Sequence, residues 1–182
     1  MKKQFVLITL LVTLSGTIAW AQSFERGTNV VNVGVGFGSA LGGRGTQIPA
    51  ISASYERGIW AIGDDVGIVS VGGYLGVKSY HYQYSTYTDK WNYIIVGARG
   101  TFHYVGFSDL PKLDPYAGIM VSYNHLRYTS NASSWVPLGG YGSAVGATGF
   151  IGARWYFSDN FAGYAELGYG VAHFNIGASL KF

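Results

Sequence analysis

Four histidines are the side chains of this sequence best suited to acid–base or metal chemistry: His81, His103, His125 and His173. None stands in an H-E-x-x-H pattern or in a paired Cys/His pattern, the spacings that hold zinc. The chain has no cysteine, which excludes thiolate chemistry and disulfides. No G-x-S-x-G motif is present to expose a nucleophilic serine. The sequence therefore predicts no catalytic, cofactor-binding or metal-binding residue, and we expect no enzyme.

A second set of chemically active residues consists of scattered charges. Each stands in a row of alternate positions that otherwise holds Gly, Ser, Asn, Thr and Tyr, opposite a row of apolar residues. Both signs occur, so these side chains can pair if the polar row faces an enclosed interior, where an unpaired charge is costly. The candidates for such interior ion pairs are Glu56, Lys78, Arg99, Arg154 and Glu166.

One pairing follows from local geometry. Arg154 and Glu166 flank the turn signal Ser158-Asp159-Asn160. Mirror pairing of two strands about Asp159 sets Gly152 opposite Glu166, which leaves Arg154 one diagonal step away and within reach. We expect these two side chains to form an ion pair, and a structural role for it is favoured over a catalytic or gating one.

Strands must position these residues, because hydrophobicity alternates with a period of two nearly throughout the chain. Turn signals rich in Gly, Ser, Asn, Asp and Pro separate the alternating segments. Longer connections are expected at Ser39–Gln47, Tyr80–Lys90 and Thr129–Gly142, and a very short one near Gly170. The eight predicted strands lie within residues 31–37, 51–56, 69–78, 93–104, 116–124, 145–157, 161–169 and 171–182.

Alternation alone fits either a soluble barrel with its apolar row inside or a membrane barrel with that row outside. A soluble protein would place many Lys, Glu and Asp residues on the other row, but only 12% of this chain is charged. The small residues of that row suit the filled interior of an eight-stranded barrel. Aromatic residues expected to form interfacial girdles near the strand ends are Tyr55, Trp60, Trp91, Tyr104, Tyr123, Trp155, Phe157, Phe161 and Tyr169.

The N-terminus has the form of an export signal. Lys2 and Lys3 precede the apolar run Phe5–Leu14, and Ala19-Trp20-Ala21 matches a cleavage site. We expect residues 1–21 to be removed and residues 22–182 to form one barrel domain. Removal of two lysines from the 12 basic residues leaves 10 against 9 acidic ones, a charge of +1. This balance does not indicate a nucleic-acid partner.

The C-terminal sequence FNIGASLKF, with Phe174, Ile176, Leu180 and Phe182 in one apolar row, resembles the assembly signal of bacterial outer-membrane barrels. Together with the export signal and the eight segments, the mature chain resembles small barrels of the OmpA/OmpX type. The resemblance implies an all-β, eight-stranded antiparallel up-and-down transmembrane barrel in the outer membrane of a Gram-negative-type envelope. It also implies recognition by the barrel-assembly machinery, both termini on the periplasmic side, and a monomer in outer-membrane lipid.

Two functions remain open for such a barrel. The first is a structural or surface-interaction role through the extracellular loops, with the lumen plugged by side chains and ion pairs. The alternative is a small pore or conduit for small or apolar solutes. The interior charges favour the first, because the interior of an eight-stranded barrel is filled. The many glycines of the interior row keep the second open. Small barrels that deacylate lipids carry a His-x-Ser pair, which this sequence lacks.

Overall fold

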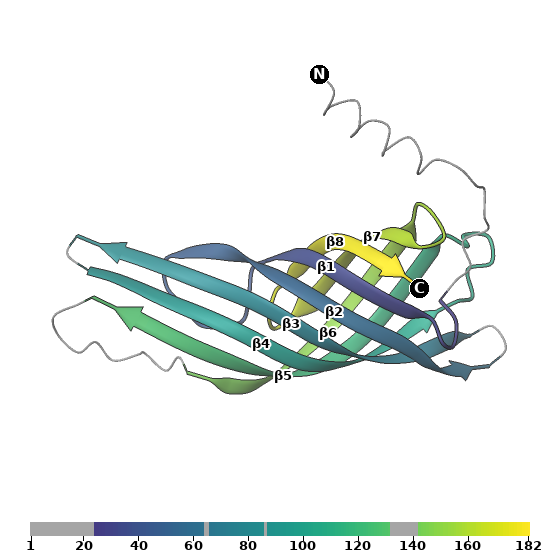
Figure 1. Cartoon of the computed structure of the whole chain (residues 1–182), viewed down its shortest axis with the longest axis horizontal. Helices are drawn as coiled ribbons and strands as arrows, with labels where there is room; N and C mark the ends of the chain where they lie inside the picture. Colours follow the sequence, from purple (N-terminus) through teal and green to yellow (C-terminus); the bar gives the residue numbers. More distant parts are fainter. Residues whose placement is uncertain (1–23, 64–65, 86, 132–141) are drawn as a thin grey trace, which may run out of the picture.

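The computed structural model describes residues 24–63, 66–85, 87–131 and 142–182. These residues form eight antiparallel strands in one sheet, and β1 pairs with β8 to close it into a barrel. Figure 1 shows the strands running in up-and-down order around the barrel. The strands are β1 (Asn29–Phe37), β2 (Thr46–Ile62), β3 (Gly67–Tyr84), β4 (Tyr87–Tyr104), β5 (Leu113–Ser130), β6 (Ala144–Tyr156), β7 (Phe161–Tyr169) and β8 (Phe174–Lys181).

The fold and the strand number predicted from the alternating pattern are confirmed. The mirror pairing about Asp159 is also correct, since Gly152 pairs with Glu166 between β6 and β7. Closure pairs the last strand with the first, so that neither keeps a free edge at the seam. The predicted signal peptide, residues 1–21, lies outside the described residues.

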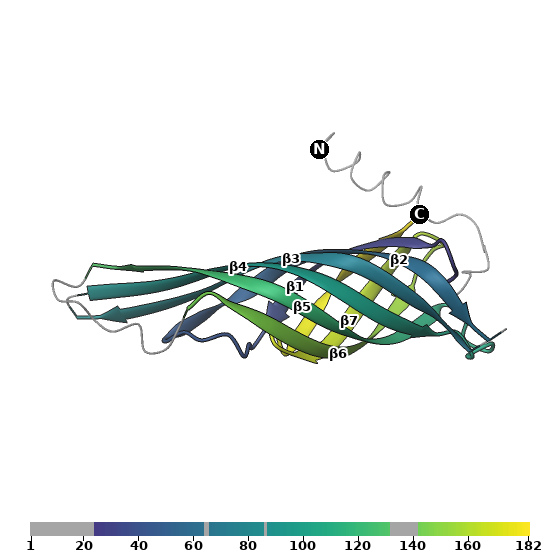
Figure 2. The same cartoon turned by 90° about the horizontal axis from the view of Figure 1, so that it is seen from below.

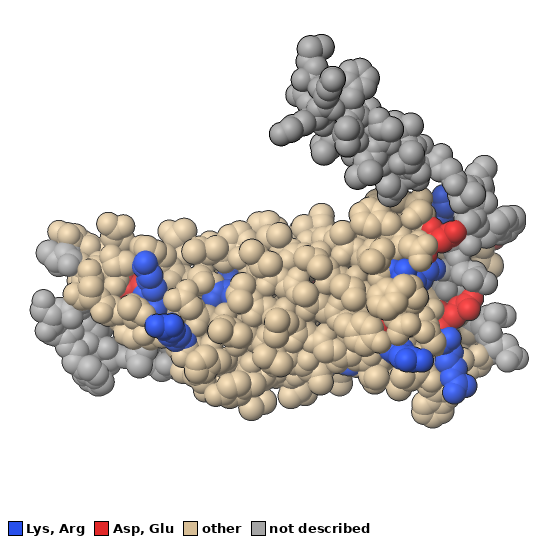
Figure 3. All heavy atoms as spheres, in the orientation of Figure 1, with Lys and Arg blue, Asp and Glu red and all other residues tan. Residues whose placement is uncertain are grey.

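The apolar row of every strand faces outward. Its aliphatic side chains are exposed around the whole ring, as are Val33, Leu75, Val96, Ile119, Ile151, Leu167 and Ile176. Figure 3 shows the result as a broad uncharged band across the middle of the barrel, with charges gathered towards its two ends. Exposed aliphatic rows around a closed sheet are what a lipid-facing barrel surface requires. The described residues contain no helix long and apolar enough to cross a membrane.

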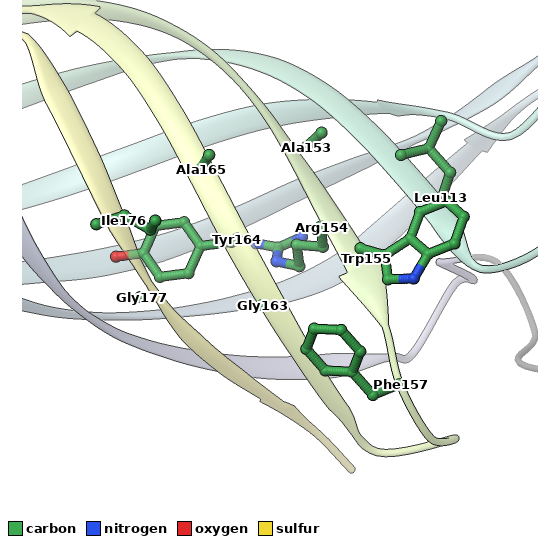
Figure 4. A pocket seen from close by; sticks show the side chains of 10 residues that line it. All are labelled: Leu113, Ala153, Arg154, Trp155, Phe157, Gly163, Tyr164, Ala165, Ile176 and Gly177. Atoms are coloured by element: carbon green, nitrogen blue, oxygen red, sulfur yellow. The ribbon is translucent and has the colours of Figure 1, made fainter.

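Small residues leave a shallow depression of about 320 Å³ in this exterior, on β6, β7 and β8. Figure 4 shows its floor at Ala153, Gly163 and Ala165, with Trp155 and Phe157 beside it. Trp155 and Phe157 are exposed there, as expected for a girdle at the end of the barrel that carries the termini. Trp91 is the exception among the predicted girdle residues. It is 4% exposed and packs inside the barrel against Tyr128, because its position on β4 belongs to the inward row.

At the end opposite the termini, β3, β4 and β5 extend well beyond their neighbours (Figures 1 and 2). The β3–β4 ladder continues to Tyr84 and Tyr87, whereas β2 joins β3 only from His81. The expectation of a loop at Tyr80–Lys90 is therefore wrong: most of that segment is strand. The reason is that its tyrosines and threonines have high strand propensity, which outweighs their polarity. Most of the predicted loop Thr129–Gly142 lies outside the described residues.

A connection of eight residues, Gly38 to Gly45, joins β1 to β2 and folds over the lumen at this same end. Gly38 and Gly45 have φ values of +66° and +81°, a backbone region that favours glycine, and they bound the excursion. The hydroxyls of Tyr80 and Tyr93 donate to the carbonyls of Leu41 and Gly42, at 2.7 and 2.8 Å. These bonds fasten the connection to β3 and β4.

Candidate functional site: two charge clusters in the lumen

Most of the charged side chains buried in the lumen lie in two clusters. All five predicted residues, Glu56, Lys78, Arg99, Arg154 and Glu166, point inward and are buried. The polar row of each strand thus faces the lumen, because successive residues of a strand point to opposite faces of the sheet. The structure groups these residues differently from the pairing expected from the β6–β7 turn.

Arg154 is the centre of the first group, here called the Arg154 cluster, which lies near the end that carries the termini. Its guanidinium donates through Nη1 to Asp114 Oδ2 at 2.7 Å and through Nη2 to Glu56 Oε1. Its Nε donates to Asn32 Oδ1 at 3.1 Å, so all three nitrogens have partners. The planar fork of an arginine suits two carboxylates at once. Arg154 has no exposed surface, which makes this pairing necessary.

His103 completes the Arg154 cluster. Its Nδ1 lies 2.8 Å from Asp114 Oδ1, and its Nε2 lies 3.1 Å from Ser70 Oγ and 3.4 Å from Glu56 Oε2. Ser70 Oγ donates to Glu56 Oε2 at 3.0 Å. Two carboxylates, one guanidinium and one imidazole therefore share a single closed network. With Asn32, and Ser179 donating to Asn32, the network reaches β1, β2, β3, β4, β5, β6 and β8.

Arg99 and Glu166 form the second group, the Arg99 cluster, nearer the middle of the barrel. Arg99 Nη2 donates to Glu166 Oε2 at 2.7 Å, which joins β4 to β7. Tyr116 donates to the same oxygen at 3.3 Å, and the Arg99 guanidinium lies 4.0 Å from the centre of the Phe150 ring. The expected pair between Arg154 and Glu166 is therefore wrong. Glu166 takes Arg99 from across the lumen, whereas Arg154 takes Asp114, its direct neighbour on β5, and Glu56 of β2.

Lys78 belongs to neither cluster. Its Nζ is 3.5 Å from Gln47 Oε1 and 5.3 Å from the centre of the Tyr80 ring, in the half of the lumen beneath the Gly38–Gly45 connection. Within the described residues, none of the ion pairs includes Lys78. The prediction that it pairs with a lumenal acid is wrong for that part of the chain.

Sequence analysis missed Asp114, His103 and Ser70 as members of a cluster. Asp114 shares the parity of Tyr116 on β5, and both are buried. His103 likewise shares the parity of Arg99 on β4. The period of two was thus a sufficient signal for burial. The period of two does not describe the curvature of the barrel, and this curvature decides which inward residues come into contact.

Ser70, His103 and Asp114 are linked in the order of a catalytic triad, in which a serine nucleophile contacts a histidine base and the histidine contacts an orienting carboxylate. Access excludes that chemistry in this arrangement, since Ser70 and His103 have no exposed surface. Phe24 stacks on the imidazole, with ring centres 3.7 Å apart and planes at 2°, and covers it. The described residues also contain no group of three or more His, Cys, Asp or Glu side chains placed to hold a metal ion. The contacts of both clusters link strands across the lumen.

Between the two clusters and the opposite end, aromatic and aliphatic side chains fill the lumen. The buried set consists of Tyr74, Tyr80, Trp91, Tyr93, Ile95, Tyr116, Met120, Phe150 and Val171. Leu41 of the Gly38–Gly45 connection packs against it. Large rings are spaced along the inward row where glycines of neighbouring strands make room. One example is Gly152, where an added Cβ would lie 2.6 Å from the Tyr116 ring. Side chains thus occupy the axis of the barrel.

This architecture defines the chain as an eight-stranded transmembrane β-barrel. The same fold occurs in crystal structures of Ail, the attachment invasion locus protein of Yersinia pestis. The structure of Ail in complex with the heparin analogue sucrose octasulfate superposes with a TM-score of 0.55 at 12% identity, covering 87% of this chain and 100% of that one. The structure of Ail alone gives a TM-score of 0.52 at 12% identity, with the same coverage. No protein-family model matches the sequence, and comparison with curated protein sequences finds no match.

Proposed function

We propose that this protein is a monomeric outer-membrane barrel whose lumen is closed and whose work is done at its extracellular end, as a surface-interaction protein without enzymatic activity. The observation that carries the proposal is the protruding sheet of β3, β4 and β5 above a filled lumen. Outer-membrane barrels have short turns on the periplasmic side and longer extensions outside. The end with the termini is then periplasmic, and the protruding sheet extends from the cell.

Charge at the protruding end favours an anionic partner. Arg44, Lys90 and Arg127 are exposed there, whereas Asp89, the acidic residue among the described residues of this end, is buried. Lys90 pairs with Thr129 and Arg127 with Asn92, so Lys90 and Arg127 are diagonal neighbours on the outer face of the sheet. Figure 3 shows basic side chains on this end of the barrel. Ail, which has the same fold, was crystallised with a sulfated heparin analogue. We infer a polyanion, such as a sulfated polysaccharide, as the class of partner.

A binding measurement tests the surface role. The mature protein in lipid nanodiscs should bind immobilised heparin at low ionic strength, and the double variant Lys90→Gln/Arg127→Gln should bind about tenfold or more weakly, which corresponds to about 1.4 kcal/mol. Surface charges act through a screened interaction, so binding should also fall as salt is added. The control is Arg57→Gln/Lys112→Gln, which removes two exposed charges at the other end. Equal losses in the two variants would refute the assignment to the protruding sheet.

A second measurement tests the closed lumen against the alternative of a small pore. Refolded wild-type protein in a planar bilayer should show no single-channel conductance, because the aromatic set and both charge clusters block the axis. The variant Arg99→Ala/Glu166→Ala removes one complete cluster and serves as the comparison. Steady conductance of the wild type, changed in this variant, would make the protein a pore and overturn the proposal.

A further inference from the structure

Lys78 is a buried cation whose described contacts are all neutral. It is 1% exposed and points inward from β3, opposite Tyr93 of β4. Its ammonium lies 3.5 Å from the side-chain oxygen of Gln47 and 5.3 Å from the centre of the Tyr80 ring. An ammonium has three N–H donors, so a single long hydrogen bond leaves most of its bonding capacity unused in the described contacts. Burying a charge without a counter-charge is strongly unfavourable.

The acidic residues that the structure describes are all placed elsewhere. Of the nine in the chain, Glu56, Asp114 and Glu166 belong to the two clusters already described. Asp89 accepts from the Tyr128 hydroxyl at 2.8 Å and stands four residues beyond Tyr93 on β4, farther out than Lys78. Glu25, Asp109 and Asp159 belong to segments at the opposite end of the barrel, and Asp64 and Asp65 lie outside the described residues. Within the described residues, none of the ion pairs gives Lys78 a carboxylate.

Polar groups from three segments surround Lys78: Gln47 of β2, the tyrosines of β3 and β4, and the Gly38–Gly45 connection. The register of β2 against β3 shifts between Ile48 and Ile51, so β2 carries a bulge beside Lys78. Bulges re-aim side chains and are common next to binding sites. Tyr80 and Tyr93 flank Lys78 and fasten the carbonyls of Leu41 and Gly42 above the lumen. Lys78 therefore lies beneath the Gly38–Gly45 connection, beside the polar side chain of Gln47.

We propose that Lys78 is the anchor of a binding site for a small inorganic oxyanion, of the phosphate or sulfate class, in the extracellular half of the lumen. The anion supplies the missing counter-charge, and the lysine ammonium binds it with Gln47 and the flanking tyrosines as walls. This site is separate from the polyanion surface at Lys90 and Arg127, because Lys78 faces the lumen and those two residues face outward. The outcome of a test of this anion site is therefore independent of whether the protruding sheet binds a polyanion.

The test compares wild-type protein with Lys78→Met and Lys112→Met, all refolded in nanodiscs, with sodium sulfate replacing sodium chloride at constant ionic strength. Lys112 is an exposed lysine at the periplasmic end and is the matched control. Sulfate should raise the urea midpoint of wild type and Lys112→Met along a saturating curve, and it should raise that of Lys78→Met by a smaller, non-saturating amount. The NMR signal of the Lys78 side chain should shift with the same saturation.

Three results would overturn the proposal. One is an equal sulfate effect in all three proteins, which would indicate a general salt effect on stability. Another is a Lys78 signal characteristic of a neutral amine at pH 7, since a neutral side chain needs no counter-ion. The third is an equal shift of the Lys78 signal by dextran sulfate, a polymer too large for the lumen, which would place the interaction on the outer surface.

Discussion

At the scale of single residues, loss of the Arg154 side chain would leave two buried carboxylates without this counter-charge. Arg154 bridges Glu56 and Asp114, and all three are buried. Removal of one member of such a network leaves an uncompensated buried charge, which costs more than the pair itself contributes.

Arg154→Met should therefore destabilise the folded barrel by about 3–5 kcal/mol, the cost of breaking a buried ion pair from one side. Urea unfolding from lipid vesicles, followed by tryptophan fluorescence, measures this free energy. Lys78→Met in chloride buffer is the matched control, because it removes a buried cation that has no described carboxylate partner, and it should not destabilise the barrel. A loss below about 1 kcal/mol for Arg154→Met would show that the cluster is hydrated and weak.

Which residues are buried could be predicted from parity alone, but their partners could not. Glu56, Arg99 and Glu166 fall on the inward row in the sequence and in the structure. Arg99 and Glu166 come from β4 and β7, however, and meet because the sheet curves through a full ring. Pairing across a lumen depends on strand tilt and stagger, quantities that a local pattern does not contain.

At the scale of elements, β4 shows how one strand serves two environments. Its middle carries Val96 outward, 54% exposed, and Arg99 inward and buried. Beyond the apolar band the same outward row carries Asn92 and Lys90. The change from aliphatic to polar residues along one face marks where the strand leaves the hydrocarbon region.

Val96→Arg should cost about 2–4 kcal/mol if Val96 lies near the middle of the bilayer, because an arginine there faces hydrocarbon. Asn92 lies on the same outward row of β4, four residues from Val96 towards the protruding end. Asn92→Arg should lower the free energy of unfolding by only about 0–1 kcal/mol, since the charge then reaches the headgroups. Unfolding free energies of both variants in vesicles provide the comparison. Equal destabilisation by both variants would mean that the cost of an outward arginine does not depend on its depth in the bilayer. No destabilisation by Val96→Arg would mean that the outward row does not face lipid.

The strand β8 supports a prediction about assembly. Phe182 is 63% exposed, and its backbone pairs with Asn29 through hydrogen bonds of 3.0 and 3.1 Å. Phe174, Ile176 and Leu180 continue the same outward row. Deletion of Phe182 should lower the amount of folded protein in the outer membrane while leaving refolding in detergent intact, because the expected signal is read by the assembly machinery. Phe157→Ala, another exposed aromatic at that end, is the control. Normal accumulation of the deletion variant would remove the assembly role.

The hairpin of β3 and β4 shows the limit of turn signals as predictors. The segment Tyr80–Lys90 is polar and aromatic, which suits either a loop or a two-sided solvent-exposed strand. The first and last pairs of this segment, Tyr80↔Trp91 and Tyr84↔Tyr87, are aromatic, and the rings of Tyr84 and Tyr87 form a tilted pair with centres 5.6 Å apart. Cross-strand aromatic contacts of this kind stabilise a hairpin, and they become visible only when the register is known.

At the scale of the whole molecule, the barrel consists of two regions with different supports. The membrane region is closed on itself, with every strand paired on both sides and charge clusters across the lumen. The protruding sheet of β3, β4 and β5 stands beyond the closed ring, where β2 and β6 no longer pair with it. Its stability comes from its own ladder and ring contacts.

Backbone hydrogen exchange should therefore divide β4 into two parts. Amides between Ile94 and Thr101 should exchange slowly, since they open only with the ring, whereas those from Thr88 to Trp91 should exchange faster through local opening of the protruding sheet. Mass-spectrometric exchange in nanodiscs resolves the two parts, and adding heparin should slow only the second. Uniform protection along β4 would mean that the protruding sheet is as firmly held as the ring. The polyanionic partner would then bind a sheet that is already rigid before binding.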